Sequence, residues 1–303
     1  MSHITLKEKV LEAIKGKLDT GISSNQLATQ IGINPATLHN IKNNRDELIS
    51  DSMWNKLATF FGITKNDWKT IFTTNAKTIN ALCADTQINS RFIAIAGYTG
   101  AGKTTALKYY ADKNASNTFY VLCNVLMGRK EFLKAIQKSI GISIEGSLIY
   151  QMQGIIDRLS GMDVPLLILD DAGKLNDGNM KLIQLIYDEL QGQCGLIMAG
   201  TDDMKRYIDK MAAKGKMGFP ELKSRIAYWQ RMYSTKPQEV AEISKANGIT
   251  DEEAIKYLTR QKSANYRDLR NAITMAKLSA AGGAVNFNIV SAIKTGDTEF
   301  TTN

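Results

Sequence analysis

The sequence contains the octapeptide Gly97-Tyr98-Thr99-Gly100-Ala101-Gly102-Lys103-Thr104, which matches the pattern G-x-x-x-x-G-K-[ST] at every position. An apolar segment, residues 92–96, precedes it, and a stretch of helical character, residues 104–113, follows it. A glycine-rich turn between a strand and a helix presents backbone N–H groups and a helix N-terminus to an anion. The octapeptide therefore predicts a loop that binds phosphate groups.

Two side chains of the octapeptide suit a nucleoside triphosphate and its metal ion. The ammonium group of Lys103 would contact the β- and γ-phosphates of ATP, and the hydroxyl of Thr104 would complete the coordination of Mg²⁺. The expected nucleotide contacts are Gly97, Tyr98, Thr99, Gly100, Ala101, Gly102, Lys103, Thr104 and Thr105. The alternative is a glycine-rich turn that binds no ligand.

The segments around the octapeptide alternate between strand and helix patterns. Continuous apolar runs predict strands within residues 92–96, 118–124, 165–170 and 194–200, separated by helical stretches. Strands that are buried on both faces have such runs, and they belong to parallel sheets covered by helices. The predicted fold class of this part of the chain is therefore α/β with a parallel sheet.

Two carboxylates, Asp170 and Asp171, end the third of these strands. The carboxyl end of a parallel strand is where such sheets hold their ligands. Asp170 is the candidate for the metal side of the site, together with Thr104. Asp171 is the candidate for orienting or deprotonating the attacking water. The alternative is a strand that is simply followed by acidic residues before a loop.

Residues 1–72 have the pattern of short amphipathic helices without strands. Residues 24–43 fit a helix-turn-helix, with Gly32 in the turn and Pro35 at the first position of the second helix. Three polar residues of that second helix are candidates for contacts in a DNA groove: Thr37, Asn40 and Lys42. The alternative is a helical domain that docks on another protein.

The sequence pattern divides the chain into four parts. These are a helix-turn-helix domain at 1–72, a linker at 73–90, an ATPase core at 91–236, and a helical lid with the C-terminal tail at 237–303. After Pro237 the strand patterns end and helical segments return. The tail is polar, and we expect it to be frayed.

The composition excludes several classes of protein. Of the 303 residues 44% are hydrophobic and 22% are charged, which is ordinary for a folded domain and unlike a disordered chain. No apolar run reaches the length of a membrane-spanning helix, and the N-terminus lacks the pattern of a secretion signal. We therefore expect a cytoplasmic protein.

The cysteine, histidine and charge counts narrow the chemistry further. Three widely spaced cysteines and two histidines argue against a disulfide framework, a zinc site and a histidine-based catalytic triad. The formal net charge of +8 favours a polyanionic partner, although a solvated basic surface would give the same value. Much of this charge lies between Lys205 and Arg231, which contains eight basic and two acidic residues.

The strand, phosphate loop, acidic strand and helical lid together resemble the AAA+ ATPases. By this resemblance, Thr201 after the fourth strand corresponds to the polar sensor residue. Arg225, or as a second choice Arg231, corresponds to the arginine that reaches the γ-phosphate of a neighbouring subunit. Arg267, in Ala264-Asn265-Tyr266-Arg267, corresponds to the second sensor, although the glycine usual in that motif is absent. For each, a structural or solvated role is the alternative.

The N-terminal helices, the compact core and the short lid resemble one group of AAA+ ATPases, the regulators of DNA transposition. The resemblance implies a protein that binds double-stranded DNA without sequence preference when loaded with ATP. It also implies assembly of identical copies into an oligomer or filament on target DNA, and delivery of that DNA to a transposase. Arg129, Lys130 and Lys174 are candidate contacts to the DNA backbone, or solvated charges.

One departure from the AAA+ pattern bears on the mechanism. The family usually has Asp-Glu where this chain has Asp170-Asp171, so the second carboxylate reaches about one methylene less far. A misplacement on the order of 1 Å can cost up to about a hundredfold in rate. We therefore expect slow ATP hydrolysis that DNA or a partner stimulates. Two other classes stay open: an AAA+ helicase loader and a nucleotide-switched helix-turn-helix transcription regulator.

Overall fold

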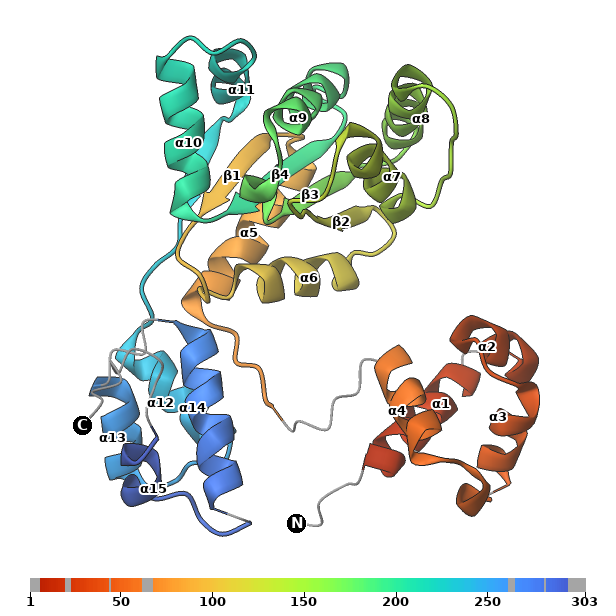
Figure 1. Cartoon of the computed structure of the whole chain (residues 1–303), viewed down its shortest axis with the longest axis vertical. Helices are drawn as coiled ribbons and strands as arrows, with labels where there is room; N and C mark the ends of the chain where they lie inside the picture. The colour runs from red at the N-terminus through yellow and green to blue at the C-terminus, as the bar shows by residue number, and fades with distance from the viewer. Residues whose placement is uncertain are drawn as a thin grey trace. The chain divides into compact units, whose positions relative to one another are not determined.

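The computed structural model describes residues 6–19, 23–43, 45–61, 68–260, 265–280 and 282–293. The chain divides into two compact units, residues 1–69 and residues 70–303, and each is described by itself (Figure 1). No helix among the described residues is both long and apolar enough to cross a membrane.

The first unit is all-helical. Its helices are α1 (Leu6–Asp19), α2 (Ser24–Ile31), α3 (Pro35–Lys42) and α4 (Asp51–Phe60), with a 3₁₀ turn, η1, at Asp46–Leu48. The amphipathic faces of these helices share one core, in which Leu27, Leu38 and Trp54 are almost completely buried. Since each helix is short, we attribute its stability to this shared core more than to helix propensity.

The turn between α2 and α3 has the local features that its sequence predicts. Gly32 has a φ of +72°, which a residue with a Cβ atom adopts at a cost. Asn34 is the N-cap of α3, its Oδ1 accepts a hydrogen bond from the Ala36 backbone N–H at 2.9 Å, and Pro35 follows at the first helical position. Gly32 and Pro35 therefore lie where the sequence predicts them, in the turn and at the first position of the second helix.

The second unit is built on a five-stranded, fully parallel sheet in the order β2-β3-β4-β1-β5. Its strands are β1 (Phe92–Ala96), β2 (Thr118–Leu122), β3 (Leu166–Asp170), β4 (Gly195–Gly200) and β5 (Tyr228–Arg231). Every residue of β1, β3 and β4 is buried, which is why their sequences are continuous apolar runs. The sequence predicts the first four strands but not the edge strand β5.

Helices cover both faces of the sheet (Figure 1). One face packs against α5 (Thr74–Ile88) and α6 (Lys103–Lys113), and this layer contains Ile79, Ile95 and Leu107. The opposite face packs against α7 (Arg129–Ser139), α8 (Leu148–Ser160), α9 (Asp177–Glu189), α10 (Asp202–Ala213) and α11 (Phe219–Arg225). A 3₁₀ turn, η2 (Ala172–Lys174), joins β3 to α9. This three-layer arrangement is the α/β class that the sequence predicts.

Most of residues 73–90, which the sequence predicts to be a linker, form the helix α5 (Thr74–Ile88). Ile79 and Cys83 of this helix are completely buried against the sheet and α6. The polar Asn75, Thr86 and Gln87 are buried as well, so the buried face of α5 does not stand out as an apolar stripe in the sequence. This segment is therefore part of the second unit and does not connect two domains.

The C-terminal part of the second unit is helical, as predicted. Its helices are α12 (Pro237–Ala246), α13 (Glu252–Arg260), α14 (Tyr266–Ser279) and α15 (Phe287–Ser291). The predicted frayed tail, residues 296–303, lies outside the described residues.

Candidate functional site

The octapeptide forms a loop between β1 and α6. Gly100 and Gly102 have φ values of +82° and +84°, and Gly102 is the N-cap of α6 without a side-chain hydrogen bond. The first backbone N–H groups of α6 therefore have no capping side chain. The Lys103 ammonium is buried beneath the loop and donates to the carbonyl oxygens of Gly97 at 2.9 Å and Tyr98 at 3.0 Å.

Charged groups from four elements act on Lys103. Burial lowers the pKa of the Lys103 ammonium, and the positive charge of Arg267 lowers it further. The carboxylates of Asp170, Asp171 and Asp202 oppose this effect. The acidic pair and the lid arginine predicted from the sequence thus lie close enough to Lys103 to act on its charge, and Asp202 is an addition that the sequence analysis missed.

Asp170 is completely buried at the end of β3. Its Oδ2 accepts a hydrogen bond from the Tyr120 hydroxyl at 2.7 Å, and its Oδ1 accepts one from the Asp171 backbone N–H at 2.9 Å. Burial and this contact with Asp170 raise the pKa of Tyr120, so the tyrosine stays a donor. Tyr120 orients the predicted metal-side carboxylate, a role that its position on a neighbouring strand hides from the sequence.

Asp171 has a left-handed backbone with a φ of +55°, a conformation that aspartate tolerates better than most residues. Its Oδ2 accepts a hydrogen bond from the Lys174 ammonium at 2.6 Å. Lys174 is one of the residues predicted to contact DNA. In this structure its ammonium is paired with the carboxylate predicted to act on the attacking water.

Thr201 follows β4, which lies between β3 and β1 in the sheet. This strand order puts Thr201 at the same edge as the phosphate loop and Asp170. Thr201 is half-buried and is the N-cap of α10, but its side chain makes no capping hydrogen bond. Its hydroxyl is therefore not used to cap the helix.

The lid touches the phosphate loop directly. The Tyr266 backbone N–H donates to the Gly100 carbonyl at 3.0 Å. Asn265 packs so closely on Gly100 that a Cβ atom there would lie 2.5 Å from its Oδ1, so the contact requires glycine. Arg267, the next residue of α14, is exposed. Ala264, the first residue of the predicted motif, lies outside the described residues.

Two buried polar side chains connect the loop, α5 and the lid. The Nδ2 of Asn75 donates to the carbonyls of Ala101 at 3.2 Å and Tyr233 at 3.0 Å. Glu239 accepts hydrogen bonds from the Thr74 backbone N–H at 2.6 Å and from the Tyr266 hydroxyl at 2.7 Å. The sequence analysis missed both, because each has a hydrogen-bond partner more than 150 residues away in the chain.

Acidic side chains neutralise much of the basic segment from Lys205 to Arg231. Six of its eight basic residues have a carboxylate partner. The pairs are Lys205 and Lys223 with Asp209, Arg206 with Asp203, Lys216 with Asp177, Arg225 with Asp188, and Arg231 with Asp202. Carboxylates such as Asp177 and Asp188, which precede the segment in the chain, therefore offset much of the positive charge that the sequence gives it.

Arg225 and Arg231 differ in their surroundings. The Nε of Arg225 donates to Asp188 at 2.6 Å, and its side chain is 41% exposed at the end of α11. Arg231 lies on β5, is 82% exposed, and is 3.7 Å from Asp202. Both side chains are accessible from outside the subunit.

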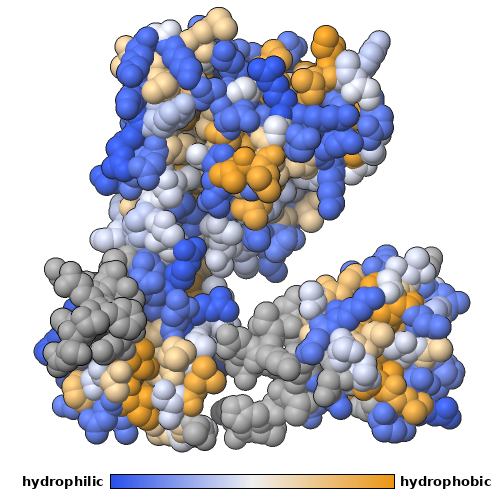
Figure 2. Space-filling view, viewed as in Figure 1, coloured by the Kyte–Doolittle hydropathy of each residue, from blue (hydrophilic) through white to orange (hydrophobic). Residues whose placement is uncertain are grey.

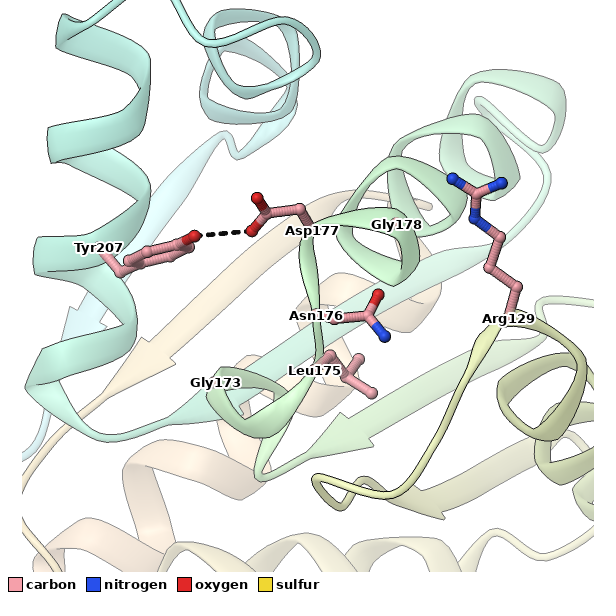
Figure 3. A pocket seen from close by; sticks show the side chains of 7 residues that line it. All are labelled: Arg129, Gly173, Leu175, Asn176, Asp177, Gly178 and Tyr207. Carbon is pink, nitrogen blue, oxygen red and sulfur yellow. Dashed lines mark hydrogen bonds between the residues drawn. The ribbon is translucent and has the colours of Figure 1, made fainter.

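A pocket of about 640 Å³ lies beside η2 and the start of α9 (Figure 3). Arg129, at the start of α7, and Tyr207, on α10, line opposite sides of it, and the Tyr207 hydroxyl donates to Asp177 at 2.6 Å. Arg129 and the adjacent Lys130 are exposed. The phosphate loop does not line this pocket, so the pocket is separate from the nucleotide site.

The DNA contacts predicted on α3 lie in the first unit. Thr37 and Asn40 are half-buried, and Lys42 is exposed. The Lys42 ammonium is 3.5 Å from the Ser24 hydroxyl at the start of α2.

The loop and its surroundings fit a nucleoside triphosphate with Mg²⁺. The loop has uncapped helical N–H groups, two glycines with positive φ and a buried ammonium, which together form an anion cradle. The Thr104 hydroxyl and the Asp170 carboxylate are oxygen donors, the kind of ligand that Mg²⁺ prefers.

Two family models match the chain. A model described as an AAA domain matches residues 87–208, and one described as the C-terminal part of the Mu B transposition protein matches residues 224–295. The Mu-like prophage FluMu DNA transposition protein B of Haemophilus influenzae is 24% identical over 252 residues, which cover 79% of this chain and 85% of that protein.

Solved structures of two archaeal proteins share the fold. Cdc6p of Pyrobaculum aerophilum aligns with a TM-score of 0.55 at 13% identity, over 72% of this chain and 65% of that one, just under two thirds of its length. A Walker-type ATPase of Pyrococcus abyssi aligns with a TM-score of 0.55 at 16% identity, over 73% and 70% of the two chains.

Proposed function

The chain belongs to the AAA+ P-loop ATPases and is related to the Mu B transposition proteins, and we propose that it is an ATP-dependent, largely sequence-nonspecific DNA-binding ATPase. In this proposal it assembles on target DNA and delivers that DNA to a transposase, or activates the transposase there. The observation that carries the proposal is the phosphate loop with Lys103 buried beneath it, in a chain whose C-terminal region matches a Mu B model.

We assign the nucleotide contacts to the loop, residues 97–105. Lys103 would exchange its two carbonyl acceptors for phosphate oxygens, and Thr104 and Asp170 would hold Mg²⁺. The metal ion, when bound, neutralises charge that develops on the phosphates. Tyr120 keeps Asp170 oriented, Asp171 orients the water, and Thr201 and Arg267 approach the γ-phosphate from the sheet and the lid.

The exposed position of Arg225 supports assembly. A subunit that places Arg225 against the nucleotide of its neighbour makes a head-to-tail contact, which generates rings or helical filaments. The arginine of this structure is paired with Asp188, and the pair is accessible. Because the γ-phosphate would attract this arginine, the assembly depends on ATP and loosens after hydrolysis.

DNA binding without sequence preference requires contacts to phosphates more than contacts to bases. The net charge of +8 supports such contacts, and the exposed Arg129 and Lys130 lie near the start of α7 with Lys174 on η2. In the first unit, we propose that α2 and α3 form a helix-turn-helix and that Thr37, Asn40 and Lys42 face DNA.

Slow hydrolysis is the fourth part of the proposal. Asp171 is shorter than the glutamate usual at its position, and the Lys174 ammonium already occupies one of its oxygens. Each feature makes it a weaker acceptor for the attacking water. Slow hydrolysis favours a long-lived assembly whose removal DNA or a partner controls.

Negative-stain microscopy of the full chain with random-sequence duplex DNA tests this function. We expect regular assemblies along the DNA with ATP or a non-hydrolysable analogue, and few with ADP. Lys103→Ala should abolish them, whereas Lys113→Ala, at the exposed end of the same helix, should not.

Three outcomes would contradict the proposal. A single-copy protein that ignores plasmid DNA at saturating analogue would exclude the assembly. A footprint at one sequence, unaffected by ATP, would indicate a transcription regulator. A preference for single-stranded DNA, with binding to a replicative helicase, would indicate a helicase loader.

A further inference from the structure

The loop between β2 and α7 exposes two neighbouring aliphatic side chains. Leu126 is 86% exposed and Val125 is 76% exposed, and Leu126 has the highest exposed fraction of the large apolar residues in the described ranges. Apolar side chains gather in Figure 2 on the face of the second unit that is turned to the viewer, over this segment. Exposed apolar side chains that adjoin one another mark a surface for a partner.

The loop is held in this conformation by side chains around it. The Oδ1 of Asn124 accepts a hydrogen bond from the Leu126 backbone N–H at 2.9 Å. The Met127 carbonyl accepts hydrogen bonds from the side-chain amides of Asn179 at 2.7 Å and Asn176 at 3.3 Å. These hydrogen bonds fix the backbone around Val125 and Leu126, which we call the tip of the loop. The two side chains therefore stay exposed to solvent and do not fold back onto the protein.

The residues that follow the tip carry positive charge. Arg129 and Lys130 begin α7 and are exposed. The whole of α7 contains four basic residues and one acidic residue, Glu131. The loop follows the carboxyl end of β2, which pairs in parallel with β3. It therefore lies at the same edge of the sheet as Asp170, the last residue of β3.

An apolar tip beside cationic side chains fits a partner that is anionic outside and apolar inside. Duplex DNA has this chemistry, because its phosphates surround stacked bases that are accessible from the grooves. Proteins that bend DNA insert leucine, isoleucine, methionine or phenylalanine between base steps and partly unstack them. A lone cationic surface would need no such tip.

We propose that Val125 and Leu126 insert into a groove of duplex DNA and partly unstack a base step, while Arg129 and Lys130 contact the flanking phosphates. This inference rests on the proposed function, since it requires the second unit to bind DNA. It adds a distortion of the duplex that phosphate contacts alone do not produce. Repeated along an assembly, one such loop from each subunit would deform the target at regular intervals.

The test uses the full chain with ATP and a random-sequence duplex that carries 2-aminopurine, whose fluorescence rises when the base is unstacked. Binding is measured in parallel by anisotropy at several salt concentrations. The double variant Val125→Ser/Leu126→Ser removes the tip. Ile149→Ser is the matched control, because Ile149 is an aliphatic residue of the same unit that is 79% exposed on α8.

We expect the wild type and Ile149→Ser to raise the fluorescence on binding. The double variant should lose this rise in fluorescence. Its affinity for DNA should fall by about tenfold or less, because insertion of the tip gains apolar contact but costs base stacking. Arg129→Gln should keep the rise at saturation but reduce the slope of log affinity against log salt by about one.

The outcomes separate this inference from the proposed function. If the wild type binds no DNA at all, the proposed function fails and the inference fails with it. If the wild type binds DNA but the fluorescence does not rise, or if the double variant keeps the rise, only the inserted tip is excluded. A double variant that still distorts DNA but no longer assembles, as judged by sedimentation, would show that the tip contacts another copy.

Discussion

The ammonium nitrogen of Lys174 lies 2.6 Å from Oδ2 of Asp171, three residues earlier in the same turn. The side chains of these two residues are 52% and 32% exposed. In the proposed function, Lys174 contacts DNA and Asp171 orients the attacking water. Because they are paired with each other here, a DNA phosphate that attracts Lys174 would release the carboxylate.

Lys174→Met should therefore raise the rate of ATP hydrolysis without DNA and reduce the stimulation by DNA. An exposed ion pair is worth about 1 kcal/mol or less, so the increase should be about fivefold at most. Steady-state phosphate release with and without duplex DNA measures both effects. Lys130→Met is the control, because Lys130 has no ion pair with Asp171 and should leave the basal rate unchanged. A basal rate of Lys174→Met at or below that of the wild type would exclude the coupling.

Arg225→Ala should preserve nucleotide binding and weaken assembly on DNA. Its guanidinium bonds to Asp188 and Ser224 of the same subunit and, among the described residues, forms no hydrogen bond with the phosphate loop, so its loss leaves the loop intact. Titration with a fluorescent ATP analogue measures nucleotide binding, and sedimentation with DNA measures assembly. Asp188→Asn provides the reverse test: it frees the arginine and should leave assembly equal or stronger. Loss of nucleotide affinity in Arg225→Ala would contradict the assignment.

Glu239→Gln should destabilise the fold near pH 7 by about 2 kcal/mol, the scale of hydrogen bonds to a buried charged group. Burial alone would raise the pKa of Glu239, but hydrogen bonds from Thr74, Tyr266 and Lys236 together lower it. A lowered pKa means that the ionised carboxylate stabilises the fold above its unfolded pKa of about 4.3, and that this contribution is lost as the pH falls through the folded pKa.

Urea unfolding of the wild type and Glu239→Gln at several pH values checks this expectation. The difference in free energy of unfolding should shrink below about pH 4. Glu242→Gln, an exposed position on the same helix, should show little difference at any pH. A difference for Glu239→Gln that is constant from pH 7 to acid would mean that ionisation is not involved.

The three cysteines should be unreactive in the folded protein. Burial raises the pKa of the thiols of Cys83, Cys123 and Cys194 to about 12. Compared with a free thiol, this lowers the thiolate fraction at pH 8 roughly a thousandfold. Ellman's reagent should therefore detect no thiol in the native protein and three after unfolding in guanidinium. Rapid labelling of any one of them in the native protein would contradict its burial.

The sequence predicts the centre of the fold because burial there leaves a strong pattern. All residues of β1, β3 and β4 are buried, so their sequences are continuous apolar runs that no surface strand would have. The phosphate loop is equally visible, since its glycines are required by backbone conformation and its lysine by chemistry. These features depend on local sequence alone.

The sequence does not predict elements whose burial depends on distant residues. The edge strand β5 has four residues, of which only Gln230 is buried, so no apolar run marks it. The helix α5 buries the side-chain amides of Asn75 and Gln87, and their hydrogen-bond partners come from other parts of the chain.

The same limit applies to the charges around the candidate site. The carboxylate that pairs with Arg225 precedes it by 37 residues, and the one that pairs with Lys216 precedes it by 39. A count of basic and acidic residues along a segment cannot include such partners. The strongly positive segment in the sequence is therefore much less positive on the surface.

The hydrogen bond from the Tyr266 backbone N–H to the Gly100 carbonyl holds the start of α14 against the phosphate loop. The helix that starts at Tyr266 has 14 residues and therefore extends about 21 Å from that contact. A tilt of a few degrees at the loop becomes a displacement of more than 1 Å at its far end. In the proposed assembly, a small change around the bound nucleotide would thus become a larger displacement at the far end of α14, where it would act on a neighbouring copy.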